Sequence, residues 1–321
     1  MRGETDRQDA RNARVGDREP VKGDWPALKE LTYYPGCALF TKAKNLDQCA
    51  RLSAEILDVK LKEMTTWNCC GAIFSTVSDD LAAQVGPIRN LARASSQGDS
   101  LVTLCAACYN VLKRSQAWVT KPGNEKTRDR FLNFIEEEKF DPNLKVLHLL
   151  EVMKNDIGFA AVRAKVKKNL KGLKLGSYYG CLMVRPEAEM QFDAVDNPMM
   201  MDDLMAALGA QPVYFPFKTE CCGGYLLVND QEASLKCAAT IINSLNAAGA
   251  EAVVTTCPLC QYNVDNQQKI LSERVAGFKK LPVFYFTQLL ALGLGIEGDV
   301  LNLDGHYVDP KPLLKSKGLI Q

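Results

Sequence analysis

The chain has 321 residues, of which 47% are hydrophobic and 24% are charged. This length is enough for two ordinary domains, each with its own core. The 39 basic residues are balanced by 38 acidic ones, which argues against a dominant nucleic-acid or polyanion surface and favours a small-molecule or protein partner.

Residues 1–30 are expected to form a flexible extension. Residues 1–24 hold six basic and six acidic residues and almost no large apolar ones, so they cannot bury enough surface to offset the entropy lost on ordering. They lack the hydrophobic core of a secretory signal, and their acidic residues do not suit a mitochondrial transit peptide. The longest apolar stretch, residues 281–296, is interrupted by a proline and polar residues. We therefore expect a cytoplasmic chain with no membrane span.

Strand-like and helix-like segments alternate along the rest of the chain. Apolar residues recur with helical periodicity over residues 46–59 and 233–248. The strand-like segments are residues 33–36, 101–104, 173–179, 212–215 and 252–256. Strands that alternate with helices form a mainly parallel sheet covered by helices on both faces, so the sequence predicts an α/β fold.

Ten of the 12 cysteines belong to one pattern that occurs twice. The pattern is a lone cysteine, then Cys-Cys-Gly, then a CxxC pair: Cys37, Cys69, Cys70, Cys105 and Cys108 in the first copy, and Cys181, Cys221, Cys222, Cys257 and Cys260 in the second. Matching cysteines lie 144 residues apart at the first position and 152 apart at the other four. This repetition indicates an internal duplication. We expect a first domain at residues 31–172 and a second at 173–321, related by a pseudo-twofold axis.

The cysteines of each copy follow strand-like segments. In open parallel sheets, ligands gather outside the carboxyl ends of the strands. Helices are expected to begin at the two CxxC pairs, and a helix amino terminus carries partial positive charge that suits an anionic thiolate group. The sequence therefore predicts one site per domain at this edge of each sheet.

Four kinds of chemistry could use these cysteines. Structural disulfides are typical of small secreted domains, and a thioredoxin-like redox pair needs only two cysteines. Four thiolates complete a zinc site, whereas each copy of the pattern supplies five. The two adjacent cysteines of each copy also suit a polynuclear iron–sulfur centre better than a single zinc ion. The spacing matches no ferredoxin run, so electrons would come from a separate protein. Iron–sulfur ligation in both halves is favoured, with zinc in one domain as the alternative.

The pattern resembles that of the cysteine-rich CCG-domain family. Thirty-one residues separate Cys37 from Cys69, 39 separate Cys181 from Cys221, and 34 follow each adjacent pair. The resemblance covers nearly everything from Leu31 onward. Within the family, the chain resembles the B subunits of heterodisulfide reductases, which have two such domains and no ferredoxin segment. The resemblance implies one noncubane [4Fe-4S] cluster per domain, held by the five cysteines of each copy.

The resemblance also implies a reaction and partners. Such B subunits cleave a disulfide with two electrons between the clusters; in methanogens it is coenzyme M–S–S–coenzyme B. A C subunit with ordinary [4Fe-4S] clusters supplies the electrons, and a flavin-containing A subunit bifurcates or collects them. Two other interpretations are open: the CCG component of a hydroxy-acid or quinone-linked dehydrogenase, and a zinc-bearing scaffold subunit.

Four residues near the cysteines are candidates for contacts at the sites. Arg185 and Lys218 lie near the expected mouth of the second site and could bind an anionic group of a disulfide, although a solvated surface charge is the simpler interpretation. Tyr109 and Tyr262, each close to a CxxC pair, are expected to pack in the walls of the sites rather than to act in chemistry.

Four further residues stand outside the duplicated pattern. Cys49 and Cys237 lie on apolar faces of the expected helices and are interpreted as structural thiols. His148 and His306 could donate a proton to a product thiolate, yet neither has a counterpart in the other half. A structural or peripheral role is the favoured interpretation for both histidines.

Overall fold

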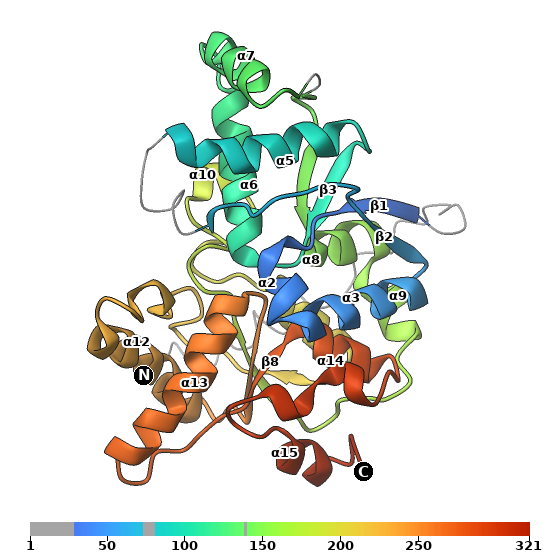
Figure 1. Cartoon of the computed structure of the whole chain (residues 1–321). Helices are drawn as coiled ribbons and strands as arrows, with labels where there is room; N and C mark the ends of the chain where they lie inside the picture. The colour runs from blue at the N-terminus through green and yellow to red at the C-terminus, as the bar shows by residue number, and fades with distance from the viewer. Residues whose placement is uncertain (1–28, 73–80, 138–139) are drawn as a thin grey trace, which may run out of the picture.

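Two parallel four-stranded sheets, one from each half of the chain, form the centre of the molecule (Figure 1). The computed structural model describes residues 29–72, 81–137 and 140–321, so nearly all of the expected extension at residues 1–30 lies outside the described residues. The first sheet contains β1 (Lys29–Tyr33), β2 (Val59–Glu63), β3 (Ser100–Thr103) and β4 (Lys145–His148). The second sheet contains β5 (Lys174–Tyr178), β6 (Gln211–Pro212), β7 (Ala252–Thr255) and β8 (Val283–Tyr285). The predicted α/β fold is confirmed.

The two sheets have the same strand order, β2-β1-β3-β4 in the first and β6-β5-β7-β8 in the second. At the ends of the central strands, Tyr33 pairs with Val102 in the first sheet, and Tyr178 pairs with Thr255 in the second. Because these parallel strands end almost level, the segments that follow them begin at one edge of each sheet. The shared order agrees with the internal duplication seen in the cysteine pattern.

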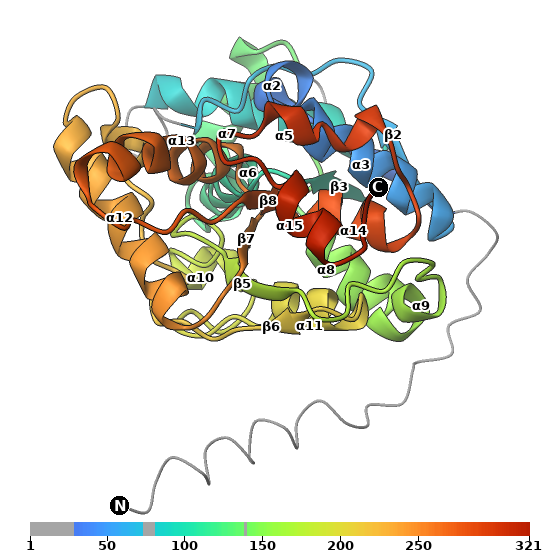
Figure 2. The ribbon, with the colours of Figure 1, turned by 90° about the horizontal axis from the view of Figure 1, so that it is seen from below.

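Helices flank both sheets (Figures 1 and 2). The helices of the first half are α2 (Gly36–Thr41), α3 (Lys44–Ile56), α5 (Val85–Ser95), α6 (Ala106–Thr120), α7 (Glu125–Phe134), α8 (Leu149–Glu151) with the π-helical turn η2 (Val152–Ile157), and α9 (Phe159–Ala164). Those of the second half are α10 (Glu187–Met190), α11 (Met200–Ala207), α12 (Gln231–Ala247), α13 (Pro258–Arg274), α14 (Phe286–Gly293) and α15 (Lys311–Ser316). Short 3-10 helices are η1 (Leu81–Gln84), η3 (Gly224–Leu226), η4 (Asp299–Leu301) and η5 (Leu303–Gly305).

Several predicted elements differ in their ends. The strand predicted at 33–36 is wrong in extent: β1 ends at Tyr33, Pro35 has no N–H to continue a ladder, and Gly36 begins α2. The helix predicted at 46–59 ends at Ile56, because Asp58 takes a φ of 60° and β2 begins directly after it. Periodicity also fails to predict β2, β4 and β8, which have three to five residues each.

The two halves share one hydrophobic core. Helix α14 of the second half lies beside α3 of the first (Figure 1), and there Thr287 Oγ1 donates a hydrogen bond of 3.0 Å to the carbonyl of Leu46. The buried thiol of Cys49 lies 3.5 Å from the carbonyl oxygen of Val300. Helix α9 similarly packs beside α11 of the second half (Figure 2). This packing fixes how the two sheets face each other, while the division at residue 172 stays a prediction.

Asp265 on α13 makes the stability of this fold depend on pH. Its buried carboxylate accepts hydrogen bonds from the backbone N–H groups of Tyr307 (2.8 Å) and Val308 (3.1 Å). Burial raises the pKa of Asp265 to about 7, so the folded state keeps a proton that the unfolded chain loses at lower pH. The free energy of unfolding should therefore fall as the pH rises toward 7.

Replacing Asp265 with asparagine should remove this pH dependence. Relative to Asp265→Asn, the wild type should lose about 3 kcal/mol of unfolding free energy between pH 5 and pH 8, because each pKa unit corresponds to about 1.4 kcal/mol. Denaturant unfolding at several pH values measures the difference. The exposed Asp299→Asn is the matched control and should follow the wild type. A wild-type slope in Asp265→Asn would contradict the assignment.

Candidate metal centre

The five cysteines of the first copy come together at the carboxyl edge of the first sheet. Cys37 lies in the first turn of α2 after β1, and the adjacent pair Cys69 and Cys70 follows β2. Cys105 caps the amino end of α6 directly after β3, and Cys108 lies in its first turn. The Sγ atoms of Cys37 and Cys69 are 3.6 Å apart, and those of Cys70 and Cys108 are 3.3 Å apart. Residues separated by up to 71 positions therefore form one group of thiols.

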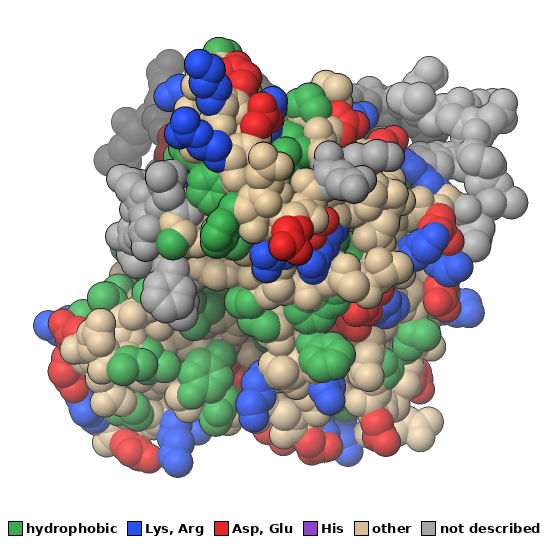
Figure 3. Space-filling model, turned by 45° about the horizontal axis from the view of Figure 1, so that its top comes forward, with side chains coloured by type: hydrophobic (Ala, Val, Ile, Leu, Met, Phe, Trp, Pro, Cys, Tyr) green, Lys and Arg blue, Asp and Glu red, His purple; other side chains and the backbone are tan. Residues whose placement is uncertain are grey.

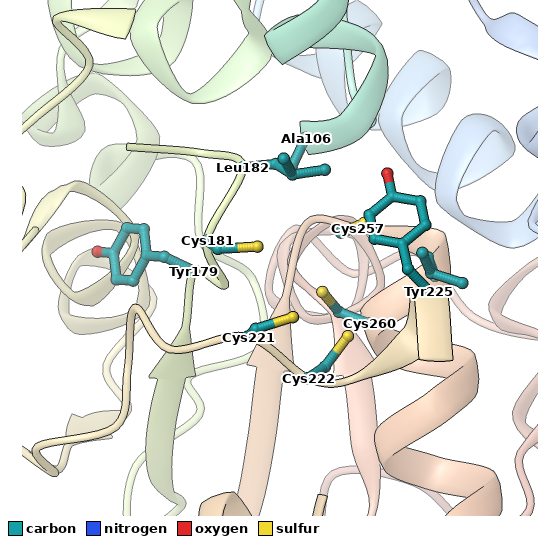
Figure 4. Close-up of a pocket in the computed structure, with 10 residues that line it drawn as sticks. Ala106, Tyr179, Cys181, Leu182, Cys221, Cys222, Tyr225, Cys257 and Cys260 are labelled. Atoms are coloured by element: carbon teal, nitrogen blue, oxygen red, sulfur yellow. The ribbon is translucent and has the colours of Figure 1, made fainter. Parts of the chain in front are cut away.

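The second copy repeats this arrangement at the carboxyl edge of the second sheet. Cys181 follows β5, Cys221 and Cys222 follow β6, and Cys257 and Cys260 begin α13 after β7. Figure 4 shows the sulfur atoms of Cys181, Cys221, Cys222 and Cys260 pointing toward one another. Ala106, at the start of α6 in the first half, also lines this pocket. The second site is therefore bordered by both halves of the chain.

The two groups of thiols meet at Cys105 and Cys257. The side chain of Cys105 interacts with that of Cys257 and, together with Cys260, lowers the pKa of Cys257 well below its usual value. In the first site, interactions with Cys108 and Cys69 likewise lower the pKa of Cys70. Crowded thiols in a buried site cannot all ionise, because each negative charge disfavours the next. A positively charged metal group would allow all of them to be thiolates.

Two buried tyrosines hold the loops of the adjacent cysteines. The hydroxyl of Tyr34 donates to the carbonyl of Asn68 (2.9 Å), and that of Tyr178 donates to the carbonyl of Glu220 (2.7 Å). Each tyrosine lies three residues before the first cysteine of its copy, and each carbonyl belongs to the residue just before Cys-Cys-Gly. Sequence reasoning missed this pair. Its signal is the tyrosine repeated at the same distance from the cysteine in both copies.

The glycine of each Cys-Cys-Gly sequence turns the backbone toward the sulfurs. Gly71 and Gly223 have φ values of 69° and 79°, a region that favours glycine. Their N–H groups donate to the sulfurs of Cys69 (3.4 Å) and Cys221 (3.3 Å). Hydrogen bonds of this kind stabilise negative charge on sulfur and tune the reduction potentials of iron–sulfur clusters.

The two cationic candidates have different surroundings. Arg185 is partly exposed and lies beside the second site. Its guanidinium donates a hydrogen bond of 2.5 Å to the carbonyl of Thr219 and lies 3.9 Å from the carboxylate of Glu220. Lys218 is only 2% exposed, and its ammonium lies 3.2 Å from the buried carboxylate of Asp202. Since this ion pair occupies the ammonium, we retain Arg185 alone as the candidate for substrate binding.

The tyrosines next to the CxxC pairs pack against other aromatic rings. Tyr109 is fully buried and packs edge-to-face on His148 and Phe192. Tyr262 is exposed and packs on Tyr307. A packing role for Tyr109 agrees with the sequence interpretation, whereas Tyr262 lies at the surface rather than in a wall.

The histidines are buried and hydrogen-bonded within the fold. His148 Nε2 lies 2.8 Å from the carbonyl of Leu104, and Nδ1 accepts from the N–H of Leu150 at the start of α8. Burial lowers the pKa of His148 to about 4, so its ring is neutral at physiological pH. His306 Nε2 lies 2.9 Å from the side chain of Gln288, and burial lowers its pKa to about 4 as well. Both arrangements agree with structural roles.

The two cysteines outside the pattern differ in their distance from the sites. Cys49 packs between the halves, and burial raises its pKa to about 12, as expected for a structural thiol. Cys237 on α12 is partly buried and packs against Gly223, since an added Cβ at that glycine would lie 3.0 Å from the Cβ of Cys237. Cys237 is therefore a neighbour of the second site that the spacing alone does not reveal.

The side chains present fit an iron–sulfur group. Soft thiolates favour iron–sulfur clusters, zinc or copper(I) over hard cations. Each site supplies five thiols, and the first and second sites share the same pattern of backbone N–H donors to sulfur. Within the described residues, no three His, Cys, Asp or Glu side chains are arranged as ligands of a single metal ion.

Comparison with known proteins identifies the family. The cysteine-rich domain called CCG matches residues 31–113 and 175–265, which together make up more than half of the chain. The chain belongs to the CCG cysteine-rich domain family. Both matches include a complete lone cysteine, Cys-Cys-Gly and CxxC set, so the family's pattern is present twice.

The relatives of this CCG protein are components of reductases. It is 32% identical to the 8-methylmenaquinol:fumarate reductase membrane anchor subunit of Wolinella succinogenes, over 89% of this chain and 99% of that one. It is 25% identical to the B subunit of a ferredoxin/F(420)H(2)-dependent CoB-CoM heterodisulfide reductase of Methanosarcina acetivorans, over 88% and 94% of the two chains. A protein of Archaeoglobus profundus that is similar to heterodisulfide reductase B subunits is 26% identical over 86% and 93%. These relatives make the chain an oxidoreductase subunit of the iron–sulfur type.

A solved structure shares the fold. A hypothetical protein from Helicobacter pylori superposes with a TM-score of 0.66 at 14% identity, covering 96% of this CCG protein and 58% of that chain. Across residues 29–72, 81–137 and 140–321, the structure contains no helix that is both long and apolar enough to cross a membrane.

Two glycines are required for close packing of the sulfurs. A Cβ added at Gly36 would lie 3.0 Å from Cys108 Sγ, and one at Gly180 would lie 3.1 Å from Cys260 Sγ. Gly36→Ala and Gly180→Ala should each lower iron binding at their own site, because the added methyl displaces a sulfur. Iron content and the absorbance of each variant measure this effect.

Gly123→Ala is the matched control for these glycine variants. Gly123 also has a positive φ, 93°, but an added Cβ would meet nothing within 4 Å. All three variants should lose about 1–2 kcal/mol of stability from backbone strain, whereas only the two at the sites should lose iron. Equal iron content in all three would contradict a role for the glycines in the sites.

Proposed function

We propose that each five-cysteine site holds one noncubane [4Fe-4S] cluster and that a disulfide is reductively cleaved where the two sites meet. The ligands would be Cys37, Cys69, Cys70, Cys105 and Cys108 for the first cluster, and Cys181, Cys221, Cys222, Cys257 and Cys260 for the second. The observation that carries this proposal is that the two five-cysteine groups adjoin: Ala106, next to Cys105, lines the pocket of the second site together with Cys257 and Cys260. When bound, the two clusters would supply the two electrons that convert a disulfide and two protons into two thiols.

The protein side chains would bind and shield the substrate. Cys105 and Cys257 are buried, so the junction of the sites excludes bulk water and strengthens the electrostatic interactions there. The partly exposed guanidinium of Arg185 is available beside the second site for a carboxylate, sulfonate or phosphate group of the disulfide. His148 would keep the end of β4 in place rather than donate a proton, because both of its ring nitrogens already have partners.

The proposal includes partner subunits that deliver electrons. We propose a ferredoxin-type C subunit with ordinary [4Fe-4S] clusters and a flavin-containing A subunit; support for partners in general is that the Methanosarcina acetivorans relative is itself one subunit of a reductase. Exposed apolar side chains lie close to both sites in the chain: Phe40 is 66% exposed three residues after Cys37, and Val228 is 93% exposed six residues after Cys222. In the lower half of the face shown in Figure 3, hydrophobic side chains gather in the middle and charged ones lie mostly along the edge. Surfaces of this kind suit contacts between subunits.

A second candidate function is electron transfer between a quinol and a partner dehydrogenase subunit. The observation that favours it is the 32% identity to the methylmenaquinol:fumarate reductase subunit over almost all of both chains. The same paired clusters would serve this reaction, since quinol oxidation also releases two electrons. The two candidates differ in whether a sulfur–sulfur bond is broken.

Metal analysis tests the cofactor proposal. Anaerobically purified protein should hold about eight irons per chain with matching sulfide, as two four-iron clusters require. Cys222→Ala should halve the iron content by removing only the second cluster. Cys237→Ala, a neighbouring thiol outside the ligand set, is the control and should keep all of the iron. One or two zinc ions with little iron would overturn the proposal in favour of a scaffold.

Substrate assays separate the two candidate functions. The reduced protein should release two thiols per disulfide cleaved, and Cys222→Ala should abolish this two-electron turnover. Thiol release is measured with a thiol reagent over a panel of anionic and neutral disulfides, and cluster reoxidation is followed by absorbance. Rapid electron exchange with a menaquinone analogue, together with no thiol from any disulfide, would establish the quinol-linked function instead.

A further inference from the structure

Asn110 connects the first half of the chain to the second site. It lies on α6, two residues after Cys108, and is completely buried. Its Nδ2 atom lies 2.8 Å from the carbonyl oxygen of Leu182 and 2.6 Å from that of Arg185. Both carbonyls belong to the turn that begins at Cys181, so a side chain of the first half holds the backbone beside a ligand of the second.

A second residue of α6 extends this connection. Lys113, about one turn further along, donates a hydrogen bond to the carbonyl of Met190 at the end of α10. Helices α6 and α10 lie side by side (Figure 1). The N–H of Arg185 bonds to the carbonyl of Cys181 at 3.1 Å, which closes the turn that Asn110 holds. The segment from Cys181 to Met190 is therefore attached to the first half at both ends.

The connection runs in one direction only. The corresponding residue of the second half, two positions after Cys260, is Tyr262, which is exposed and packs on Tyr307. Asn263 instead donates to the carbonyl of Cys222 at 2.7 Å, within its own half. Among residues 29–72, 81–137 and 140–321, the side chains of α13 make no equivalent hydrogen bond to the backbone beside a first-site cysteine.

The hydrogen bonds of Asn110 position the turn at some cost in stability. In the described structure, its Oδ1 atom is buried and has no hydrogen-bond partner. An apolar group of similar size would remove this unpaired oxygen but would leave the carbonyls of Leu182 and Arg185 without their donor, which is itself unfavourable. The variant should therefore lose some overall stability, and the turn at Cys181 should lose its constraint.

We propose that Asn110 is a positioning residue through which α6 sets the geometry of Cys181 and Arg185 at the second site. The same helix carries Cys105 and Cys108 at its amino end, so the first site and the mouth of the second are placed by one rigid element. The inference rests on the proposed function, because it treats Cys181 as a cluster ligand and Arg185 as a substrate contact. In this arrangement the second site is complete only when the first half is correctly folded against it.

Asn90 provides a matched control within the first half. It is also a completely buried asparagine, on α5, and its Nδ2 donates to the carbonyl of Asn68 at 2.8 Å while its Oδ1 accepts from the N–H of Asn68 at 3.0 Å. Asn68 directly precedes Cys69. Asn90 therefore holds a turn of its own site as Asn110 holds a turn of the other.

The test compares Asn110→Leu with Asn90→Leu by spectroscopy of the two clusters. Cys70→Ala and Cys222→Ala first assign the electron paramagnetic resonance signals to the second and first sites respectively. Asn110→Leu should then lower the iron affinity of the second site by about tenfold, as is usual for residues that orient metal ligands, and shift its signal alone. Asn90→Leu should do the same to the first site. Asn110→Ser is a smaller change for use if Asn110→Leu does not fold.

A measurement without metal makes the inference independent of the cluster assignment. In the iron-free full-length chain, alkylation followed by peptide mass spectrometry should show faster labelling of Cys181 in Asn110→Leu and of Cys69 in Asn90→Leu, when each variant is labelled well below its own unfolding temperature. Unchanged labelling of Cys181, or equal changes at both sites, would overturn the role of Asn110. Wild-type protein that binds no iron would instead count against the proposed function alone.

Discussion

The contact between Cys105 and Cys257 is the constraint on which the rest of the structure depends. It brings two groups of buried thiols to one point, where neighbouring negative charges oppose one another and burial opposes each charge. The fold opposes this crowding with backbone N–H donors, helix amino termini and a core shared by the two halves. A positively charged cofactor would relieve what remains. The site is thus built for an occupant rather than for ten free thiols.

Duplication explains the parts that the two halves share, and its exceptions show where they differ. Strand order, the tyrosines that hold the Cys-Cys-Gly loops and the glycines beside Cys108 and Cys260 occur in both halves. The buried ion pair of Lys218 and Asp202 belongs to the second half. The hydrogen bonds of Asn110 run from the first half to the second. The two sites therefore have the same ligand set in different surroundings. Equal ligands need not give equal reduction potentials, because hydrogen bonds and burial also set them.

The sequence reveals the two five-cysteine patterns because cysteine spacing is a local signal that survives duplication. It also predicts the α/β fold, since five strand-like segments and two amphipathic helices stand out. It could not predict the contact between Cys105 and Cys257, which depends on how two sheets face each other. Lys218 looks like a surface charge in the sequence until packing reveals Asp202 beside it. The three-residue β8 lies within a long apolar stretch that periodicity cannot divide.

The packing of α14 on α3 has a consequence for the order in which the protein is made. The hydrogen bond between Thr287 and Leu46 joins residues 241 positions apart, so α3 cannot be covered by α14 until the segment around Thr287 has left the ribosome. Contacts of such long range form late and leave apolar surface open to aggregation in the meantime. The two halves can therefore reach their final arrangement only after α14 has been made. Cofactor insertion at their junction would then follow the synthesis of both halves.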